Sequence, residues 1–279
     1  MSAKGRTLVI RPPASTWMDV RAHLRELMSY GDLLRTLSRH RINVRYRQTL
    51  LGVAWAVLQP LLLMLIFAVV FSRLARIPSE GAPYPLFAYA ALLPWTCFST
   101  AVTNATGSLV SHTQLITKVY FPREILPITY IVAALFDFTL GLAALAGLIT
   151  WYDVPITMAA LWLIPVVALL AAWILAVSLA LSALQVRWRD VGVALPIGVQ
   201  ILMFVSPVIY PLDVVPASWR AVYLLNPMAG IIQSFRDVLL RGQIPDAVPF
   251  AFAIGVTAAA LPLAYVHFKR IEATMADVV

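Results

Sequence analysis

The chain has 279 residues, of which 61% are hydrophobic and only 12% are charged, and its mean hydropathy is +0.84. This composition excludes an ordinary soluble domain and favours an integral membrane protein. The net charge is +8, but the basic residues cluster beside apolar stretches instead of along a soluble basic face. The sequence therefore does not predict a nucleic-acid-binding protein.

The first 49 residues are polar and contain no apolar run long enough for a cleavable signal peptide. Within them, apolar residues recur at helical spacing opposite a charged face: Trp17, Val20, Leu24, Leu27 and Met28. This pattern predicts an amphipathic helix that lies on the cytosolic membrane surface. The same stripe would be a core face in a soluble protein, but no soluble core is available here to receive it.

Six later stretches are long and apolar enough to cross a bilayer as helices. They are residues 50–74, 84–110, 125–150, 158–184, 191–210 and 247–268. The sequence thus predicts an all-α membrane protein with three parts: a cytosolic segment 1–49, a six-helix transmembrane domain 50–268, and a cytosolic tail 269–279.

The orientation follows from the basic residues. Of the 21 Lys and Arg residues, 16 fall in the N-terminal segment, two alternate connections and the tail, and five fall in the opposite connections. Because Lys and Arg are retained in cytoplasmic loops, both termini are predicted to be cytosolic.

The connection 211–246 is unusually long for an outer loop and is rich in apolar residues. It contains two short amphipathic pieces separated by Asn226 and Pro227, and the second places Gln233, Ser234, Arg236 and Asp237 opposite its apolar face. Pieces this short cannot span, so we predict a re-entrant outer helical hairpin before the sixth span. Two interfacial helices are the alternative.

No motif for ATP hydrolysis and no cluster with metal-ligand spacing is present, so we expect no catalytic residue, metal or cofactor in this subunit. Asp137 is the one ionisable residue deep within a span, and it must find a partner. It is either a contact or latch in a transport path or a hydrogen-bonding partner of a nearby Ser or Thr. Cys97 lies in an apolar stretch and is expected to be inert.

Four short stretches resemble those of a known family: VRYRQTLLGVAW at 44–55, KVYFPRE at 118–124, SPVIY at 206–210 and LNP at 225–227. They resemble permease subunits of bacterial type-2 ABC exporters for cell-surface polysaccharide of the O-antigen, capsule or teichoic acid type. The resemblance implies a multi-pass protein of the bacterial inner membrane. It also implies a coupling helix at 111–122 that docks on a separate ATPase.

The resemblance implies a complex of two copies of this chain with two ABC ATPase subunits, which hold the ATP and Mg. The implied substrate is an undecaprenyl-type lipid-linked glycan, surrounded by membrane phospholipid. The expected ATPase-coupling residues are Lys118, Tyr120, Phe121, Pro122 and Arg123.

Two further groups of residues receive roles by the same likeness. A gate for the anionic lipid headgroup is expected at Arg39, Arg41, Arg45 and Arg47, although plain positive-inside anchoring explains these residues equally well. Channel-lining aromatics, which could instead face lipid, are Trp55, Phe67, Phe71, Phe204 and Tyr210. Overall likeness favours an O-antigen-type substrate.

Other classes remain open. A permease for drugs or another amphiphile would share the fold. An ion-coupled secondary transporter would usually show inverted repeats, and none is visible. A membrane-bound enzyme would need carboxylates or His gathered near one interface, whereas the four His residues are scattered.

Overall fold

The computed structural model describes residues 20–47, 49–74, 78, 79, 81–272 and 275, and all regular structure in them is helical. The helices before the second span are α1 Val20–Ser29, α2 Gly31–Tyr46, α3 Ala54–Phe67 and its π-helical continuation η2 Ala68–Leu74. The middle helices are α4 Tyr84–Thr106, α5 Ser108–Ser111, α6 Thr113–Lys118, α7 Ile125–Trp151, the 3₁₀ turn η3 Met158–Trp162 and α8 Leu163–Arg187. The last are α9 Val191–Phe204, η4 Leu212–Val214, α10 Ala217–Tyr223, α11 Pro227–Leu239 and α12 Ala247–Glu272.

Five helical segments are long and apolar enough to cross a membrane: Ala54–Ser72, Tyr84–Thr106, Ile125–Trp151, Met158–Arg187 and Ala247–Glu272. They correspond to five of the six predicted spans. The remaining apolar helix, α9, has 14 residues and is therefore about 21 Å long, which is short for a hydrocarbon core of about 30 Å. The predicted span 191–210 is thus interrupted after Phe204, close to Pro207, which has no backbone N–H to continue a helix.

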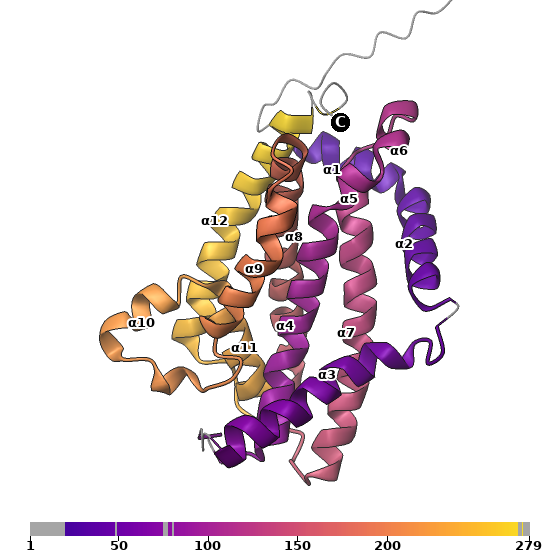
Figure 1. Ribbon diagram of the computed structural model, residues 1–279. Coiled ribbons are helices and arrows are strands. Elements are labelled where there is room, and N and C mark those ends of the chain that lie inside the picture. The colour runs from indigo at the N-terminus through magenta and orange to yellow at the C-terminus, as the bar shows by residue number, and fades with distance from the viewer. Residues whose placement is uncertain (1–19, 48, 75–77, 80, 273–274, 276–279) are drawn as a thin grey trace, which may run out of the picture.

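Helix α4 occupies the centre of the bundle. It packs against α7, α8, α11 and α3. In the most apolar stretch of α4, 78% of the residues are buried. Figure 1 shows α3 crossing α4 and α7 obliquely, whereas α7, α8 and α12 run along the length of the molecule. The outer face of α3 is open, and Leu65 and Ile66 on it are 53% and 56% exposed.

A second hydrophobic cluster lies at one end of the bundle, which we call the α6 end. Phe121 and Ile116 pack there with Phe268 of α12, and Leu27 of α1 adds to their surface. Both the first described helix and the C-terminal end of α12 therefore meet the α5 and α6 segment at this end, while α10 lies toward the other (Figure 1).

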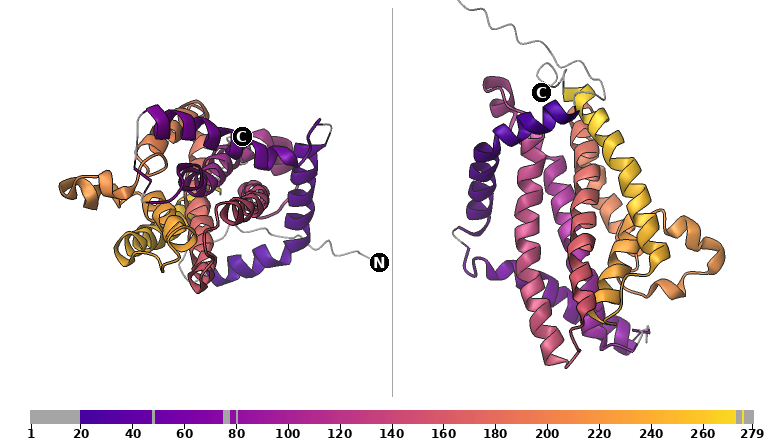
Figure 2. Two further views of the ribbon diagram at one scale, coloured as in Figure 1. Left: turned by 90° about the horizontal axis from the view of Figure 1, so that it is seen from below. Right: turned by 180° about the vertical axis from the view of Figure 1, so that it is seen from behind.

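The N-terminal segment contains two helices where the sequence predicts one. Trp17 and the side chains of Val20 and Leu24 lie outside the described residues; Leu27 packs against the second cluster, and Met28 is 80% exposed. Helix α2, which the sequence analysis missed, lies against α7 (Figure 2).

The polar face of 231–239 is buried together with the apolar one. In α11 the residues Gln233, Ser234, Arg236 and Asp237 are all at most 5% exposed, because α4, α8 and α12 enclose the helix. Gly230 permits this packing: a Cβ at that position would overlap the carbonyl oxygen of Pro249 in α12. The first piece, α10, has no buried residue.

Candidate functional site: an arginine-lined face between α2 and α7

Asp137, halfway along α7, is paired with α2. Its Oδ2 lies 2.6 Å from Arg45 Nη1, and its Oδ1 accepts a hydrogen bond from the Tyr46 hydroxyl. The side chains of Arg45 and Asp137 are 35% and 15% exposed. The partner that a carboxylate at this depth requires is thus supplied by a basic residue of the expected headgroup gate and by a tyrosine, not by Ser or Thr.

Arg41, one turn earlier on α2, has neutral partners. Its Nη2 lies 3.0 Å from His112 Nε2, and its guanidinium stacks 4.0 Å from the centre of the Tyr130 ring. His112 Nδ1 lies 2.9 Å from the Ser108 carbonyl oxygen, which can only accept. His112 therefore donates from Nδ1 and accepts from Arg41 through Nε2. The other two predicted gate residues, Arg39 and Arg47, are exposed.

Three cavities meet at Arg45. One of about 420 Å³ lies among α3, α4 and α7 and is lined by Asp137, Gln59, Thr96 and Thr100 besides apolar groups. A second, of about 210 Å³, is lined by Arg45, Tyr46, Trp55, Ala56 and Gln59. A third, of about 360 Å³, is lined by Arg41, Val44, Arg45, Asn104, Tyr130 and Ala133. The polar side chains of this face are therefore gathered around one guanidinium.

The predicted channel aromatics lie in different surroundings. Trp55 is 40% exposed beside the 210 Å³ cavity. Phe67 is only 7% exposed and meets Phe71 edge-on at 5.2 Å. Phe204 is 54% exposed, and the hydroxyl of Tyr210 donates to its carbonyl oxygen at 2.8 Å. Only Trp55 is thus brought near Arg45, and the channel-lining role of all five residues stays a prediction.

The predicted coupling segment consists of two short helices, α5 and α6, followed by an extended stretch. Lys118 is exposed, and Tyr120 is 63% exposed. Phe121 is 4% exposed within the second cluster, and Pro122 is buried as well. The side chains of Lys118 and Tyr120 are therefore accessible at the surface. Those of Phe121 and Pro122 attach the segment to the bundle.

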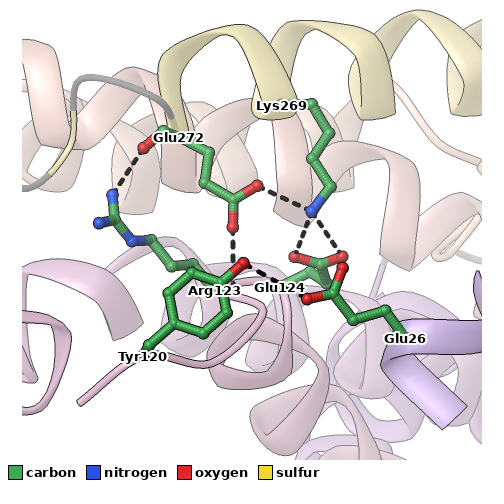
Figure 3. Close-up of polar contacts among 6 residues, drawn as sticks. All are labelled: Glu26, Tyr120, Arg123, Glu124, Lys269 and Glu272. Atoms are coloured by element: carbon green, nitrogen blue, oxygen red, sulfur yellow. Dashed lines mark hydrogen bonds and ion pairs between the residues drawn. The ribbon is translucent and has the colours of Figure 1, made fainter. Parts of the chain in front are cut away.

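A charged network ties the end of this segment to α12 (Figure 3). Glu272 Oε1 accepts from the backbone N–H of Arg123 at 3.0 Å, and the Arg123 Nη1 donates to the Glu272 carbonyl oxygen at 2.6 Å. Lys269 Nζ lies 2.9 Å from Glu124 and 2.7 Å from Glu272. On the other side, the Tyr120 hydroxyl donates to Glu26 of α1 at 3.4 Å. The sequence predicts coupling roles for Tyr120 and Arg123 but none for Glu26, Lys269 or Glu272, which lie far from residues 118–124 in the chain.

Burial raises the pKa of Glu124, and the nearby charge of Glu272 raises it further, although Lys269 acts in the opposite direction. The network therefore holds two carboxyl groups around one ammonium at the junction of the coupling segment and α12. This joint links the segment to α12 through the side chains of Glu124, Lys269 and Glu272.

Arg236 organises the opposite half of the molecule. Its side chain is fully buried and donates to the carbonyl oxygens of Pro207 at 2.7 Å, Val208 at 3.0 Å and Tyr210 at 3.3 Å. Its guanidinium also lies 3.5 Å from the centre of the Phe87 ring. Arg236 thus fixes the non-helical stretch that follows α9.

Five helical segments that are long and apolar enough to cross a bilayer define an integral membrane protein. The chain belongs to the ABC-2 type transporter family, and the match to this family covers residues 32–240.

The relatives are named as export or transport proteins for polysaccharides. The chain is 33% identical over 237 residues to the O-antigen export system permease protein RfbA of Myxococcus xanthus, covering 81% of this chain and 87% of that protein. It is 27% identical to the RfbA of Klebsiella pneumoniae, over 76% of this chain and 82% of the relative. It is also 24% identical to the polysialic acid transport protein KpsM of Escherichia coli, over 84% and 91%.

Proposed function

We propose that the protein is the channel-forming membrane subunit of an ATP-driven exporter that moves lipid-linked polysaccharide across the bacterial cytoplasmic membrane. The observation that carries this proposal is the match to an O-antigen export permease across 81% of the chain. The similarity to a polysialic acid transport protein supports the same substrate class. Among polysaccharides, the higher identity to the O-antigen permeases favours an O-antigen-type glycan.

In the proposed topology α9 and the stretch to Tyr210 together form the fifth crossing, and α12 forms the sixth. Both termini face the cytosol, so the α6 end is the cytosolic end, and α1 lies on the inner membrane surface. Helices α10 and α11 form the re-entrant outer hairpin, with α11 inside the bundle and α10 at its edge. The concentration of basic residues in α2, α6 and the end of α12 supports this orientation.

The proposed assembly contains two copies of this chain and two ABC ATPase subunits. ATP and Mg are held by those partners, and this subunit is non-catalytic. The exposed residues Lys118 and Tyr120 would contact the ATPase. The network of Glu124, Lys269 and Glu272 would carry the resulting movement into α12.

The lipid headgroup is proposed to meet the basic residues Arg39, Arg41 and Arg45 of α2 and Arg47, which directly follows this helix. The glycan would follow between the two copies, along aromatic side chains such as Trp55. A headgroup linked through phosphate is anionic, and arginine binds phosphate oxygens through paired N–H donors.

Co-purification tests the partner. A tagged chain extracted from its own host in mild detergent is expected to bring down an ATPase with nucleotide-binding motifs in a one-to-one ratio. The double change Lys118→Glu with Tyr120→Ala should reduce that recovery at least about tenfold, because a lost contact of about 1.4 kcal/mol corresponds to a factor of ten.

Tyr152→Ala is the matched control, since Tyr152 is also exposed but follows the C-terminal end of α7. Recovery of the ATPase with the double variant at the wild-type ratio would remove Lys118 and Tyr120 from the interface. Absence of any ATPase with the wild-type chain would favour an ion-coupled transporter, with Asp137 as the first candidate for the coupling site.

A further inference from the structure

The cavity of about 360 Å³ between α2, α4 and α7 has an unusual lining. Its polar side chains are those of Arg41, Arg45, Asn104 and Tyr130, and each of them can donate a hydrogen bond. No carboxylate is among the described residues that line it. Two guanidinium groups therefore share a cavity whose described lining supplies no negative charge.

Arg41 is the more informative of the two arginines. Its described contacts are the imidazole of His112 and the ring of Tyr130, and no ion pair joins it to a carboxylate in the described part of the chain. A guanidinium remains protonated under all relevant conditions and is costly within a bilayer unless an anion is near. The cavity thus has the chemistry of an anion-binding site.

Arg45 differs because the chain supplies its counter-ion. Asp137 pairs with it at 2.6 Å from the side of the 420 Å³ cavity, which both residues line. The Tyr46 hydroxyl donates to the same carboxylate. If an anion took the place of Asp137 on Arg45, Asp137 would keep the hydrogen bond from Tyr46 and would open toward Gln59 and Thr96 of the larger cavity.

We propose that Asp137 is the resting counter-ion of Arg45, and that a lipid diphosphate held by Arg41, Arg45, Asn104 and Tyr130 displaces it on binding. The identity of that lipid as the exported substrate rests on the function proposed above. Two guanidinium groups match the two phosphoryl groups, and Asn104 and Tyr130 add donors for the remaining oxygens. Because Arg45 and Asp137 belong to different helices, the exchange also loosens α2 from α7.

Binding by the intact complex in phosphatidylcholine nanodiscs tests the site. The probes are undecaprenyl diphosphate, the uncharged undecaprenol, and phosphatidylglycerol as an ordinary anionic lipid, each quantified by native mass spectrometry. We expect the diphosphate to bind at least about tenfold more tightly than either other lipid. Arg41→Gln should weaken that binding about tenfold, whereas Asp137→Asn should strengthen it several-fold, because the internal competitor loses its charge.

Arg35→Gln is the matched control, because Arg35 is an exposed arginine of the same helix that lines none of the three cavities. If Asp137→Asn does not fold, Tyr46→Phe is expected to weaken diphosphate binding, because the displaced Asp137 would then lose the hydrogen bond that it otherwise keeps.

Equal binding of undecaprenol and undecaprenyl diphosphate would overturn the anion site, and equal binding of phosphatidylglycerol would overturn its assignment to the substrate. Unchanged diphosphate affinity in both the Asp137 and the Tyr46 variants would overturn the exchange. Any of these results with an ATPase still present in the complex would leave the exporter assignment standing, so the two failures are distinguishable.

Discussion

Replacing Arg236 by Met is expected to give the largest loss of stability of any single change proposed for this protein. The substitution removes three hydrogen bonds to the carbonyl oxygens of Pro207, Val208 and Tyr210 and leaves them in a buried region. A buried acceptor without a partner costs about 1–3 kcal/mol, and the contact with the Phe87 ring is lost as well. We expect a loss of at least about 3 kcal/mol.

Thermal unfolding of the detergent-solubilised protein, followed by the monodisperse fraction in size-exclusion chromatography, measures this loss. Arg236→Lys should fall between Arg236→Met and the wild type, because an ammonium keeps the charge but cannot reach several carbonyls with a planar fork. Arg220→Met is the control: Arg220 is 42% exposed and meets Asp213 at 3.5 Å, so its loss should cost less than about 0.5 kcal/mol. Equal melting temperatures for the Arg236→Met variant and the wild type would contradict the clamp that we assign to this side chain.

Replacing Lys269 by Met is expected to have the second largest effect. It removes the ammonium that lies between Glu124, which is 3% exposed, and Glu272, which is 16% exposed. Removing one partner from a buried ion pair typically lowers the free energy of unfolding by about 3 kcal/mol or more, because the remaining charge stays buried without a counter-charge. The change should also weaken the attachment of the coupling segment to α12.

The cost should depend on pH in a direction set by Glu124. Burial and the charge of Glu272 already raise its pKa above the ordinary 4.5, and loss of Lys269 removes the interaction that opposes this rise. The folded state of the Lys269→Met variant therefore binds the Glu124 proton more tightly than the unfolded state does. Stability of the variant should then increase as the pH falls from neutral toward about 5, and it should decrease as the pH rises through the folded-state pKa.

Melting temperatures of wild type and variant between about pH 5 and 8 check this prediction. The double variant Lys269→Met with Glu124→Gln should recover part of the stability at about pH 7 and lose most of the pH dependence. A Lys269→Met protein whose melting temperature is unchanged, or one that becomes less stable than wild type at low pH only, would contradict the proposed joint.

The sequence predicts the helical architecture well where apolar length decides it. The segments now seen as Tyr84–Thr106, Ile125–Trp151 and Ala247–Glu272 begin at the predicted residues, because about 20 apolar residues leave a membrane helix as the main solution. The predicted fifth span fails as a continuous helix. After Phe204 the chain is irregular, because it contains Pro207 and carbonyl groups that bind Arg236. A hydropathy profile does not reveal this interruption of the helix.

The contacts that build the candidate site are harder to predict. Tyr46 and Asp137 are 91 positions apart, and no periodicity links α2 to α7. Helical spacing predicts Arg236 on the polar side of its helix, where an arginine is normally exposed. The structure instead encloses Arg236 and satisfies it with carbonyl oxygens. The stretch SPVIY is recognisable in the sequence, but only the fold shows that Arg236 holds it in place.

The coupling segment shows the same limit on a smaller scale. Phe121 was predicted beside Lys118 and Tyr120 as a contact of the ATPase, yet its side chain is buried against Phe268 and Ile125. A family motif marks which residues matter together, but it does not separate those that face a partner from those that hold the segment in place.

The most direct test of the central claim is the fate of the polysaccharide when this protein is depleted from its own host. We expect the amount of surface polysaccharide to decrease and full-length glycan on its lipid carrier to accumulate in the cytoplasmic leaflet. The wild-type chain should reverse both effects. Normal surface polysaccharide without intracellular lipid-linked glycan, together with accumulation of a drug or another amphiphile, would contradict this expectation and would assign the exporter a different substrate.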